Sequence, residues 1–429
     1  MTTFEDWDDS TIRMALFSPN SAFSRVTALA ALRPVHAAFQ RLHGNPKTIM
    51  DWQVQLVSIP APPFGEQARA AWLAARFVEA GLHAVNTDEL GNVFGWLPAA
   101  KLPPESTGPV VVLSAHLDTV FPAETPLHPV VDGDRLEAPG ACDNGAGVAG
   151  MLAIASALVK SGANLAAPLI FLGNVGEEGE GDLRGVRHLY NQPALAGRIA
   201  AHIVLDGAGA DSAVTQALGS RRYRVTVTGP GGHSFADAGT PNPIDALALA
   251  ITELTQTPLD SPPRTTLNVG TISGGTSVNS IPERAQAAID FRSTSAEQLV
   301  RLEVALHRAV EDAVVHCNAQ AKPRNRGLLA FAVDLIGDRP AAQLPADSPL
   351  MQMLNAVDRH LGLRTDLRLG STDANIPLSL GVPALSMGAG GEGGGAHTLA
   401  EWYSAKDREA GLRRVLLLTL ALTEWAAEQ

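Results

Sequence analysis

The sequence predicts an α/β protein with a mostly parallel sheet, split by an inserted α+β domain of ferredoxin-like order. Short, almost continuously apolar runs alternate with helical patterns in the first half, which is typical of parallel strands covered on both faces. The pattern changes near residue 217 and returns after Pro340. At 429 residues the chain is also too long for one ordinary core, so an insertion or a second domain is expected.

The first part of the chain shows a β-α-β-α order. Strands are expected at the apolar runs 109–114, 168–172 and 199–205. Helices are expected at 66–80 and 147–160, and the second helix is closed by a Ser-Gly stop signal. These elements predict the core of the parallel sheet.

The middle of the chain alternates polar and apolar residues, as half-exposed strands do. Its elements follow the order β-α-β-β-α-β: strand 222–228, helix 243–256, strands 266–272 and 285–292, helix 296–319 and strand 328–335. Helices at 348–361 and 405–427 and a strand at 382–386 then resume the first pattern. We therefore expect one domain at 1–216 and 339–429, and an inserted domain at 217–338.

Composition excludes several classes of protein. A net charge of −12 argues against a nucleic-acid partner, and no apolar stretch is long enough to span a membrane. The acidic start of the chain lacks the features of a signal peptide, which predicts a cytoplasmic location. Cys142 and Cys317 are too few for a disulfide framework, although a single bridge between them stays open.

Side chains able to bind metals follow several predicted strands. In open α/β sheets, ligands gather at the carboxyl ends of the strands. The candidates there are His116 and Asp118 in Ser-Ala-His-Leu-Asp-Thr-Val, the pair Glu177 and Glu178, Asp206 in Val-Leu-Asp-Gly, and His397 after a Gly-rich loop. A further acid, Asp143, lies in a turn of small residues that leads into a helix.

Each of these residues alone is more often a cap or a surface residue than a ligand. Together they would be costly to bury without a cation that neutralises them. Two imidazoles among carboxylates favour zinc, cobalt or manganese over magnesium or calcium, and zinc is the first expectation. The sequence therefore predicts a site for divalent metal ions.

Several strings in order resemble the di-zinc exopeptidase family that contains aminoacylase, peptidase T and the glutamate carboxypeptidases. They are His-x-Asp-Thr-Val, Cys-Asp-Asn-Gly-Ala-Gly, the paired Glu, and Gly-Gly-Thr-Ser-Val-Asn-Ser-Ile-Pro-Glu running to Ile-Asp-Phe-Arg. The resemblance covers the chain from about residue 50 and is greatest to peptidase T. It implies a zinc-exopeptidase fold with two metal ions.

The resemblance assigns the metal ligands. Asp143 would bridge the two ions, His116 and Asp206 would complete one site, and Glu178 and His397 would complete the other. One departure from the family is Asn144, where many members have a second Asp beside the bridging residue.

The resemblance also assigns two catalytic carboxylates. Glu177 would be the general base that takes a proton from the metal-activated water and relays it to the leaving amine. Asp118 would orient His116, because a ligating imidazole usually gives its second N–H to a carboxylate. His116 and Asp118 are two positions apart, and residues at that spacing in a strand point to the same side.

The inserted domain is expected to act as a lid that also forms a homodimer. By resemblance, His233 would stabilise the oxyanion, while Asn279 and Arg292 would hold the substrate backbone and its carboxylate. Arg292 as a plain surface residue is the alternative.

Three functions stay open at this point. The first is a di- or tripeptide aminopeptidase, and the second is a deacylase of N-acyl amino acids, which needs the same metals. The third is a catalytically silent relative that binds peptides. The substrate side chain, the physiological metal, the oligomeric state and the role of the first 45 residues are not predicted.

Overall fold

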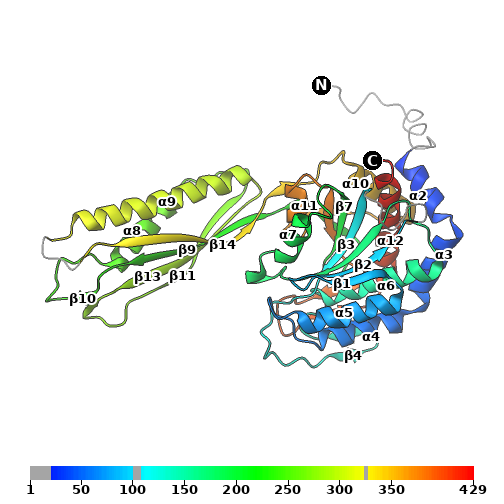
Figure 1. Ribbon diagram of the computed structural model, residues 1–429, viewed down its shortest axis with the longest axis horizontal. Helices are drawn as coiled ribbons and strands as arrows, with labels where there is room; N and C mark the ends of the chain where they lie inside the picture. The colour runs from blue at the N-terminus through cyan, green and yellow to red at the C-terminus, as the bar shows by residue number, and fades with distance from the viewer. Residues whose placement is uncertain (1–20, 100–107, 323–326) are drawn as a thin grey trace, which may run out of the picture. The chain divides into compact units, whose positions relative to one another are not determined.

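The computed structural model describes residues 21–99, 108–322 and 327–429, and it divides into two compact units. The first unit comprises Met1–Thr215 with Gln343–Gln429, and the second comprises Gln216–Ala342. Figure 1 shows the elements of both units. Cys142 and Cys317 lie in different units and are free thiols, so they form no bridge.

The first unit is built on a mixed sheet in the order β1-β2-β6-β3-β7-β17-β8-β15, with β16 paired to β8. Its four central strands run parallel: β6 (Leu169–Asn174), β3 (Val110–His116), β7 (Ile199–Leu205) and β17 (Ala384–Met387). The flanking strands are β1 (His83–Thr87), β2 (Val93–Leu97), β8 (Ser212–Ala217), β15 (Ala342–Gln343) and β16 (Asp366–Gly370). The α/β class with a mostly parallel central sheet is confirmed.

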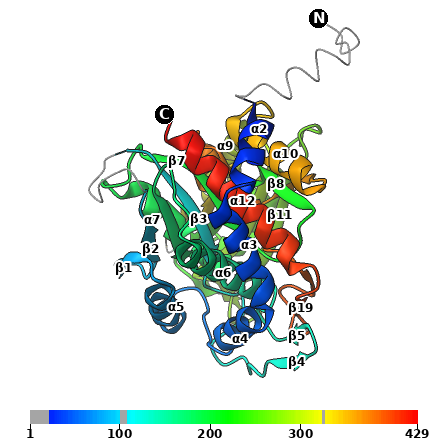
Figure 2. The same ribbon diagram turned by 90° about the vertical axis from the view of Figure 1, so that its right-hand side faces the viewer.

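Helix α6 (Gly145–Ser161) is buried from Gly145 to Leu158 because it lies between layers. It packs on β3 and β7, while α3 (Arg33–Gly44) and α4 (Pro46–Val57) cover it from outside. Figure 2 shows α3 beside α12 (Arg408–Ala426), which also packs on β3 and β7. Other helices of this unit are α2 (Ala22–Ala30), α5 (Gln67–Ala80), α7 (Arg184–Asn191), α10 (Pro349–Leu361) and α11 (Asn375–Ser379).

The described part of the N-terminal segment belongs to the core of the first unit. Helix α2 packs on α10 and α12, and α3 packs on α6 and α12. Val26 and Ala38 are fully buried in these contacts. The segment that the sequence left without a role therefore stabilises the helical layer that backs the sheet.

A second, smaller sheet in this unit has the order β18-β19-β5-β4. Its strands are β4 (Val130–Asp132), β5 (Arg135–Glu137), β18 (Glu392–Gly394) and β19 (Trp402–Ser404). It joins two distant parts of the chain, the segment before α6 and the Gly-rich loop near the C-terminus. A short 3-10 helix, η1 (Gly179–Gly181), follows the paired glutamates.

The second unit is an antiparallel sheet in the order β11-β13-β9-β14 with two helices. The chain order is β9 (Gly219–Thr228), α8 (Pro243–Thr255), β11 (Thr265–Gly274), β13 (Arg284–Ser293), α9 (Ala296–Ala319) and β14 (Ala330–Arg339). This is the ferredoxin-like order. The core lies where alternate residues of β9 and β13, such as Val225 and Ile289, meet Leu247 of α8 and Leu306 of α9.

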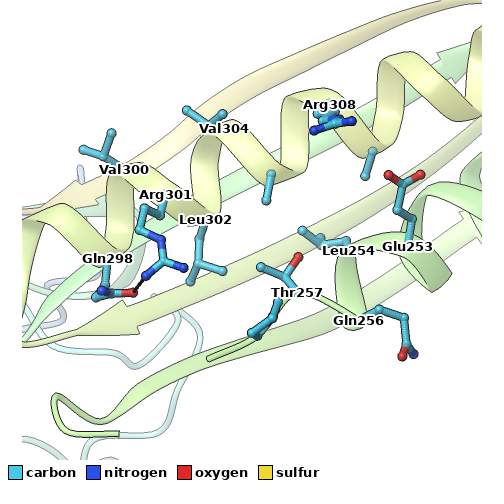
Figure 3. Close-up of a pocket in the computed structure, with 13 residues that line it drawn as sticks. Glu253, Leu254, Gln256, Thr257, Gln298, Val300, Arg301, Leu302, Val304 and Arg308 are labelled. Carbon is cyan, nitrogen blue, oxygen red and sulfur yellow. Dashed lines mark hydrogen bonds between the residues drawn. The ribbon is translucent and has the colours of Figure 1, made fainter. Parts of the chain in front are cut away.

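A surface hollow of about 540 Å³ lies between the end of α8 and α9. Figure 3 shows Val300, Val304 and Leu302 on α9 and Leu254 on α8 along its walls. Arg301 Nη1 donates to Gln298 Oε1 at 3.2 Å on the same helix. None of the site residues predicted from the sequence lines this hollow.

The described helices include none that is both long and apolar enough to cross a membrane.

A buried ion pair joins α12 to α10 and yields a test of the fold. Arg414 is fully buried and donates from Nε to Asp358 Oδ1 at 2.6 Å. We expect Arg414→Met to lower the free energy of unfolding by about 3–5 kcal/mol, because it leaves the buried Asp358 carboxylate without its positive partner and with only the Thr365 hydroxyl as a donor among the described residues. Chemical denaturation followed by circular dichroism measures the loss.

Arg368→Met is the matched control, because Arg368 lies 3.3 Å from Asp366 with more than half of its side chain exposed. Exposed pairs contribute little, so this variant should change stability by less than about 1 kcal/mol. Equal unfolding midpoints for the two variants would contradict the buried pair's role.

Candidate metal centre

The parallel strands bring acidic and imidazole side chains to one edge of the sheet. His116 is the last residue of β3 and lies in register with the last residue of the neighbouring β6. Glu177 and Glu178 follow β6, and Asp206 follows the last residue of β7. Because parallel strands end at the same edge, these side chains converge there.

Two further residues reach this edge from loops. Asp143 lies in the turn that enters α6, directly before the N-cap residue Asn144. His397 lies between β18 and β19 and has a left-handed backbone, with φ of 65°. Gly395 beside it, with φ of 70°, allows the loop to turn tightly.

The two carboxylate oxygens of Asp143 face two different histidines. Oδ1 lies 3.1 Å from His116 Nε2, and Oδ2 lies 3.2 Å from His397 Nε2. Asp206 Oδ1 is 3.9 Å from His116 Nε2, and Glu178 Oε1 is 3.1 Å from His397 Nε2. The residues thus form two groups that share Asp143, and the ligand atoms within each group lie within 4.8 Å of one another.

The contact between His116 and Asp143 requires a cation. His116 Nδ1 lies 3.0 Å from the backbone oxygen of Asp118, and when it donates there, Nε2 of the neutral ring carries a lone pair. Asp143 Oδ1 is buried and accepts no hydrogen bond from any residue that the structure describes. Two acceptors 3.1 Å apart repel each other unless a proton or a metal ion lies between them.

The donor set fits a transition-metal ion. Bond lengths of about 2.0–2.2 Å around tetrahedral zinc place ligand atoms about 3.3 Å apart. The closest approaches in the two groups range from 3.1 to 3.9 Å. Each group combines one imidazole nitrogen with carboxylate oxygens, a combination that zinc, cobalt and manganese accept.

The concentrated negative charge of the centre favours the protonated forms of three of its side chains. The hydrogen bond to Asp143, together with the Glu178 charge, raises the pKa of His397 to about 9 against the effect of burial. Burial raises the pKa of Glu178 to about 7 although both histidines oppose it. Burial also acts to lower the pKa of His116, but the nearby carboxylates of Asp118, Asp143 and Asp206 outweigh it and raise the pKa well above its usual value. Metal binding would displace these protons.

Glu177 lies beside the two groups and is largely buried. One of its carboxylate oxygens lies within 4.8 Å of ligand atoms of His116 and Glu178. Side chains of neighbouring residues in an extended segment diverge, which would separate a base at Glu177 from a ligand at Glu178. The structure instead keeps Glu177 within ligand distance, so its role as base depends on the resemblance and not on distance.

Asp118 lies beside His116, as expected, and also contacts the backbone of the paired glutamates. Its carboxylate is 3.7 Å from His116 Nδ1, and the backbone oxygen of Asp118 is closer to that nitrogen, at 3.0 Å. The carboxylate accepts hydrogen bonds from the backbone N–H of Glu177 at 3.0 Å and of Glu178 at 2.7 Å. The chain leaves β3 at His116, so strand alternation no longer governs where the Asp118 side chain points.

Asn144 uses its amide in a way that a carboxylate could not. Its Nδ2 donates to the backbone oxygen of Leu205 at 2.8 Å, and its Oδ1 accepts from the N–H of Gly147 at 3.1 Å and of Gly207 at 3.2 Å. These bonds join the turn of Asp143 to the end of β7, next to Asp206. The departure from the family pattern is therefore matched by a local hydrogen-bond network.

Sequence reasoning missed several buried polar residues behind the centre. Asp373 is fully buried and accepts from Asn174 Nδ2 at 2.7 Å, and burial raises the pKa of Asp373 to about 7. Arg69 and Glu401 are also buried. These three residues belong to no motif that follows a predicted strand. A single polar residue in a sequence does not indicate by itself that it will be buried.

Within the second unit, the structure brings together two of the three predicted lid residues. His233 pairs with Ser280 in the β10–β12 bridge (Gly232–His233 with Ser280–Ile281), and Ser234 N donates to the backbone oxygen of Asn279. His233 Nδ1 accepts from the N–H of Phe235 at 3.1 Å, which leaves Nε2 as the protonated nitrogen of the neutral ring.

Arg292 lies apart from these two residues. β13 begins at Arg284, shortly after Asn279 and β12, and Arg292 is near its other end. The separation of eight residues between Arg284 and Arg292 spans about 27 Å in an extended strand. The Nε atom of Arg292 donates to Asp290 Oδ2 at 2.8 Å. This contact uses only Nε, so the Nη groups of the guanidinium remain the donors for its predicted role.

A centre of imidazoles and carboxylates at the carboxyl edge of an α/β sheet is typical of metal-dependent hydrolases. The family model described as Peptidase family M20/M25/M40 matches residues 112–421, and the chain belongs to this family. The recognition of the exopeptidase family from the sequence motifs is thereby confirmed.

Curated relatives agree with this class. The chain is 33% identical over 122 residues to the cytosol non-specific dipeptidase of Escherichia coli. The aligned region covers 26% of this chain and 24% of that protein. It is 26% identical over 325 residues to the succinyl-diaminopimelate desuccinylase of a Methylobacterium species, covering 68% of this chain and 79% of that protein. The first relatives are thus matched over only 24% to 49% of their length.

Solved structures share the fold. A tripeptidase from Staphylococcus aureus superposes with a TM-score of 0.69 at 21% identity, covering 90% of this chain and 99% of that chain. The aminopeptidase PepT from Bacillus cereus gives a TM-score of 0.68 at 20% identity, covering 89% and 99%. At these identities the likeness concerns the fold alone.

The shared carboxylate predicts how metal content responds to substitution. We expect His116→Ala and His397→Ala each to reduce the content from two ions to one, because each removes a ligand from a different group. Asp143→Ala should lose both ions, because both groups use it. Elemental analysis after dialysis measures the content, with exposed His43→Ala as the control. Retention of both ions by Asp143→Ala would contradict the sharing.

Proposed function

We propose that the protein is a two-metal peptidase, with zinc as the first candidate ion, that hydrolyses an amide bond in small peptides as di- and tripeptide aminopeptidases do. The observation that carries the proposal is the Asp143 carboxylate, whose two oxygens face His116 and His397 at 3.1 and 3.2 Å. This arrangement suits a bridging ligand. Cobalt or manganese could replace zinc with the same donor set.

The ligands divide into two sets in this proposal. His116, Asp206 and Asp143 hold one ion, and Glu178, His397 and Asp143 hold the other. When bound, such a pair of ions polarises the scissile carbonyl and lowers the pKa of a water molecule. His116, Glu177 and Glu178 are buried, which limits solvent on that side of the centre and strengthens these electrostatic effects.

Glu177 is the proposed general base. Its carboxylate lies beside both ligand groups and would take a proton from the attacking water and pass it to the leaving amine. The Asp118 carboxylate accepts a hydrogen bond from the backbone N–H of Glu177 at 3.0 Å, which fixes the position of the Glu177 backbone. Water attacks directly, so no covalent enzyme intermediate is required.

A deacylase of N-acyl amino acids is the second candidate. The match to the Methylobacterium desuccinylase, which extends over 68% of this chain, favours it. The peptidase motifs and the match to the Escherichia coli dipeptidase favour the first candidate. A silent peptide-binding relative is the third candidate and is weakened because Glu177 and all the ligand positions are present.

The remaining parts of the proposal rest on the resemblance. His233, Asn279 and Arg292 would contact the substrate, residues 217–338 would act as lid and dimerisation domain, and the partners would be small peptides. A cytoplasmic location is supported by the name of the Escherichia coli relative, a cytosol dipeptidase.

Substrate profiling separates the candidates. The metal-loaded protein is assayed against di- and tripeptides with free or blocked termini and against N-acetyl and N-succinyl amino acids. Cleavage of unblocked peptides supports the peptidase, and turnover of N-acyl amino acids alone identifies a deacylase. Metal binding without any turnover contradicts both.

The base assignment has its own test. We expect Glu177→Gln to lower kcat by about 10²–10⁴-fold, because it removes the proton acceptor while keeping the shape of the side chain. Metal content should stay unchanged if Glu177 is a base, and should fall if it is a ligand. Glu180→Gln is the matched control, since Glu180 is an exposed residue of η1.

A further inference from the structure

Glu401 is a buried carboxylate beside the metal centre to which the proposed function gives no role. It lies four residues after His397, directly before β19, and is 1% exposed. Its Oε1 accepts hydrogen bonds from the backbone N–H of Cys142 and of Asp143, both at 2.7 Å. Its Oε2 accepts from the N–H of Gly140 at 2.9 Å.

These three bonds hold the turn that carries Asp143. The turn has left regular secondary structure, so its backbone N–H groups need other acceptors, and bonds to a charged acceptor are short and strong. Gly140 has φ of 75°, and a Cβ there would lie 2.8 Å from Thr119 Cγ2, so the turn is packed closely. Glu401 therefore fixes the direction from which the Asp143 side chain leaves the backbone.

Glu401 also connects the loops of two ligands. Its own N–H donates to the backbone oxygen of Thr398, next to His397, and its backbone oxygen accepts from Ala138 N. The loop of His397 and the turn of Asp143 are thus joined through one residue. A shift of Glu401 would therefore move both Asp143 and His397, whose side chains are 3.2 Å apart.

Arg69 is a buried cation whose charge acts on Glu401 through space. Arg69 is 2% exposed, and its guanidinium donates to the backbone oxygens of Ile59 at 2.7 Å and Leu117 at 2.9 Å. Burial lowers the pKa of Arg69 to about 10, and the charges of Asp118 and Glu401 oppose that effect. Arg69 therefore stays protonated at neutral pH and balances the carboxylates behind the centre.

We propose that Glu401 is a positioning residue that orients Asp143 so that its two oxygens point to different metal ions. This inference rests on the proposed function, because it requires that Asp143 bridge two ions. Glu401 itself touches neither substrate nor metal in this account. Its effect passes through the backbone of Gly140, Cys142 and Asp143.

Glu401→Gln tests the inference with little change of shape. The amide oxygen can still accept from Cys142 and Asp143, but the amide NH₂ then faces the Gly140 N–H, and two donors repel. We expect about 10- to 100-fold weaker binding of Co²⁺, the range found when residues that orient ligands are changed. The absorption bands of bound Co²⁺ should also shift, because the ligand geometry changes.

Asp358→Asn is the matched control. Asp358 is also a buried carboxylate of the first unit, but it pairs with Arg414 and has no contact with the ligand turns. It should lower stability while leaving Co²⁺ affinity and spectrum unchanged. If Glu401→Gln does not fold, Glu401→Asp takes its place. It keeps the charge but shortens the side chain, so it should also weaken Co²⁺ binding.

Amide hydrogen exchange gives a readout that needs no metal. In the metal-free protein, Glu401→Gln or Glu401→Asp should speed exchange at Gly140, Cys142 and Asp143 relative to Asp358→Asn. Unchanged exchange and unchanged Co²⁺ affinity in both variants would overturn the inference. If the unaltered protein binds no Co²⁺, the proposed function fails instead, and the two failures are therefore distinguishable.

Discussion

The backbone of the ligand-bearing turns is held by two buried carboxylates, and the geometry of the centre depends on these bonds. Asp118 accepts the N–H groups of Glu177 and Glu178, and Glu401 accepts three N–H groups around Asp143. The ligands are therefore placed by main-chain hydrogen bonds before any ion binds. Preorganisation of this kind is what metal-dependent hydrolysis needs, since ligand geometry sets the acidity of the water.

The same arrangement concentrates negative charge at one edge of the sheet. The carboxylates that bind backbone, Asp118 and Glu401, are buried, and Asp143 and Asp206, which face the histidines, are half-buried beside them. Arg69 is a buried positive charge that acts on Asp118 and Glu401. Without ions, the two histidines take up protons, as the raised pKa of His397 indicates. Divalent ions would neutralise this excess of negative charge, so metal binding and the stability of the first unit are coupled.

The sequence predicted the fold and the location of the centre because both depend on local patterns. Apolar runs identified β3, β6 and β7, and ligands were sought where these strands end. It did not predict the contacts of Asp118 with the backbone of the paired glutamates, because the chain turns away from the strand after His116. It also missed Glu401, whose role depends on a turn more than 250 residues away, at Asp143. Single polar residues acquire such roles only through tertiary contacts.

Anomalous diffraction from crystals grown with Zn²⁺ tests the central claim most directly. The account predicts two peaks at the zinc absorption edge, one among His116, Asp143 and Asp206 and one among Asp143, Glu178 and His397. Both peaks should lie within bonding distance of Asp143, about 2.0–2.2 Å from its oxygens. A single peak, or a peak held by His116, Glu177 and Glu178 without Asp143, would contradict the bridging carboxylate and the roles derived from it.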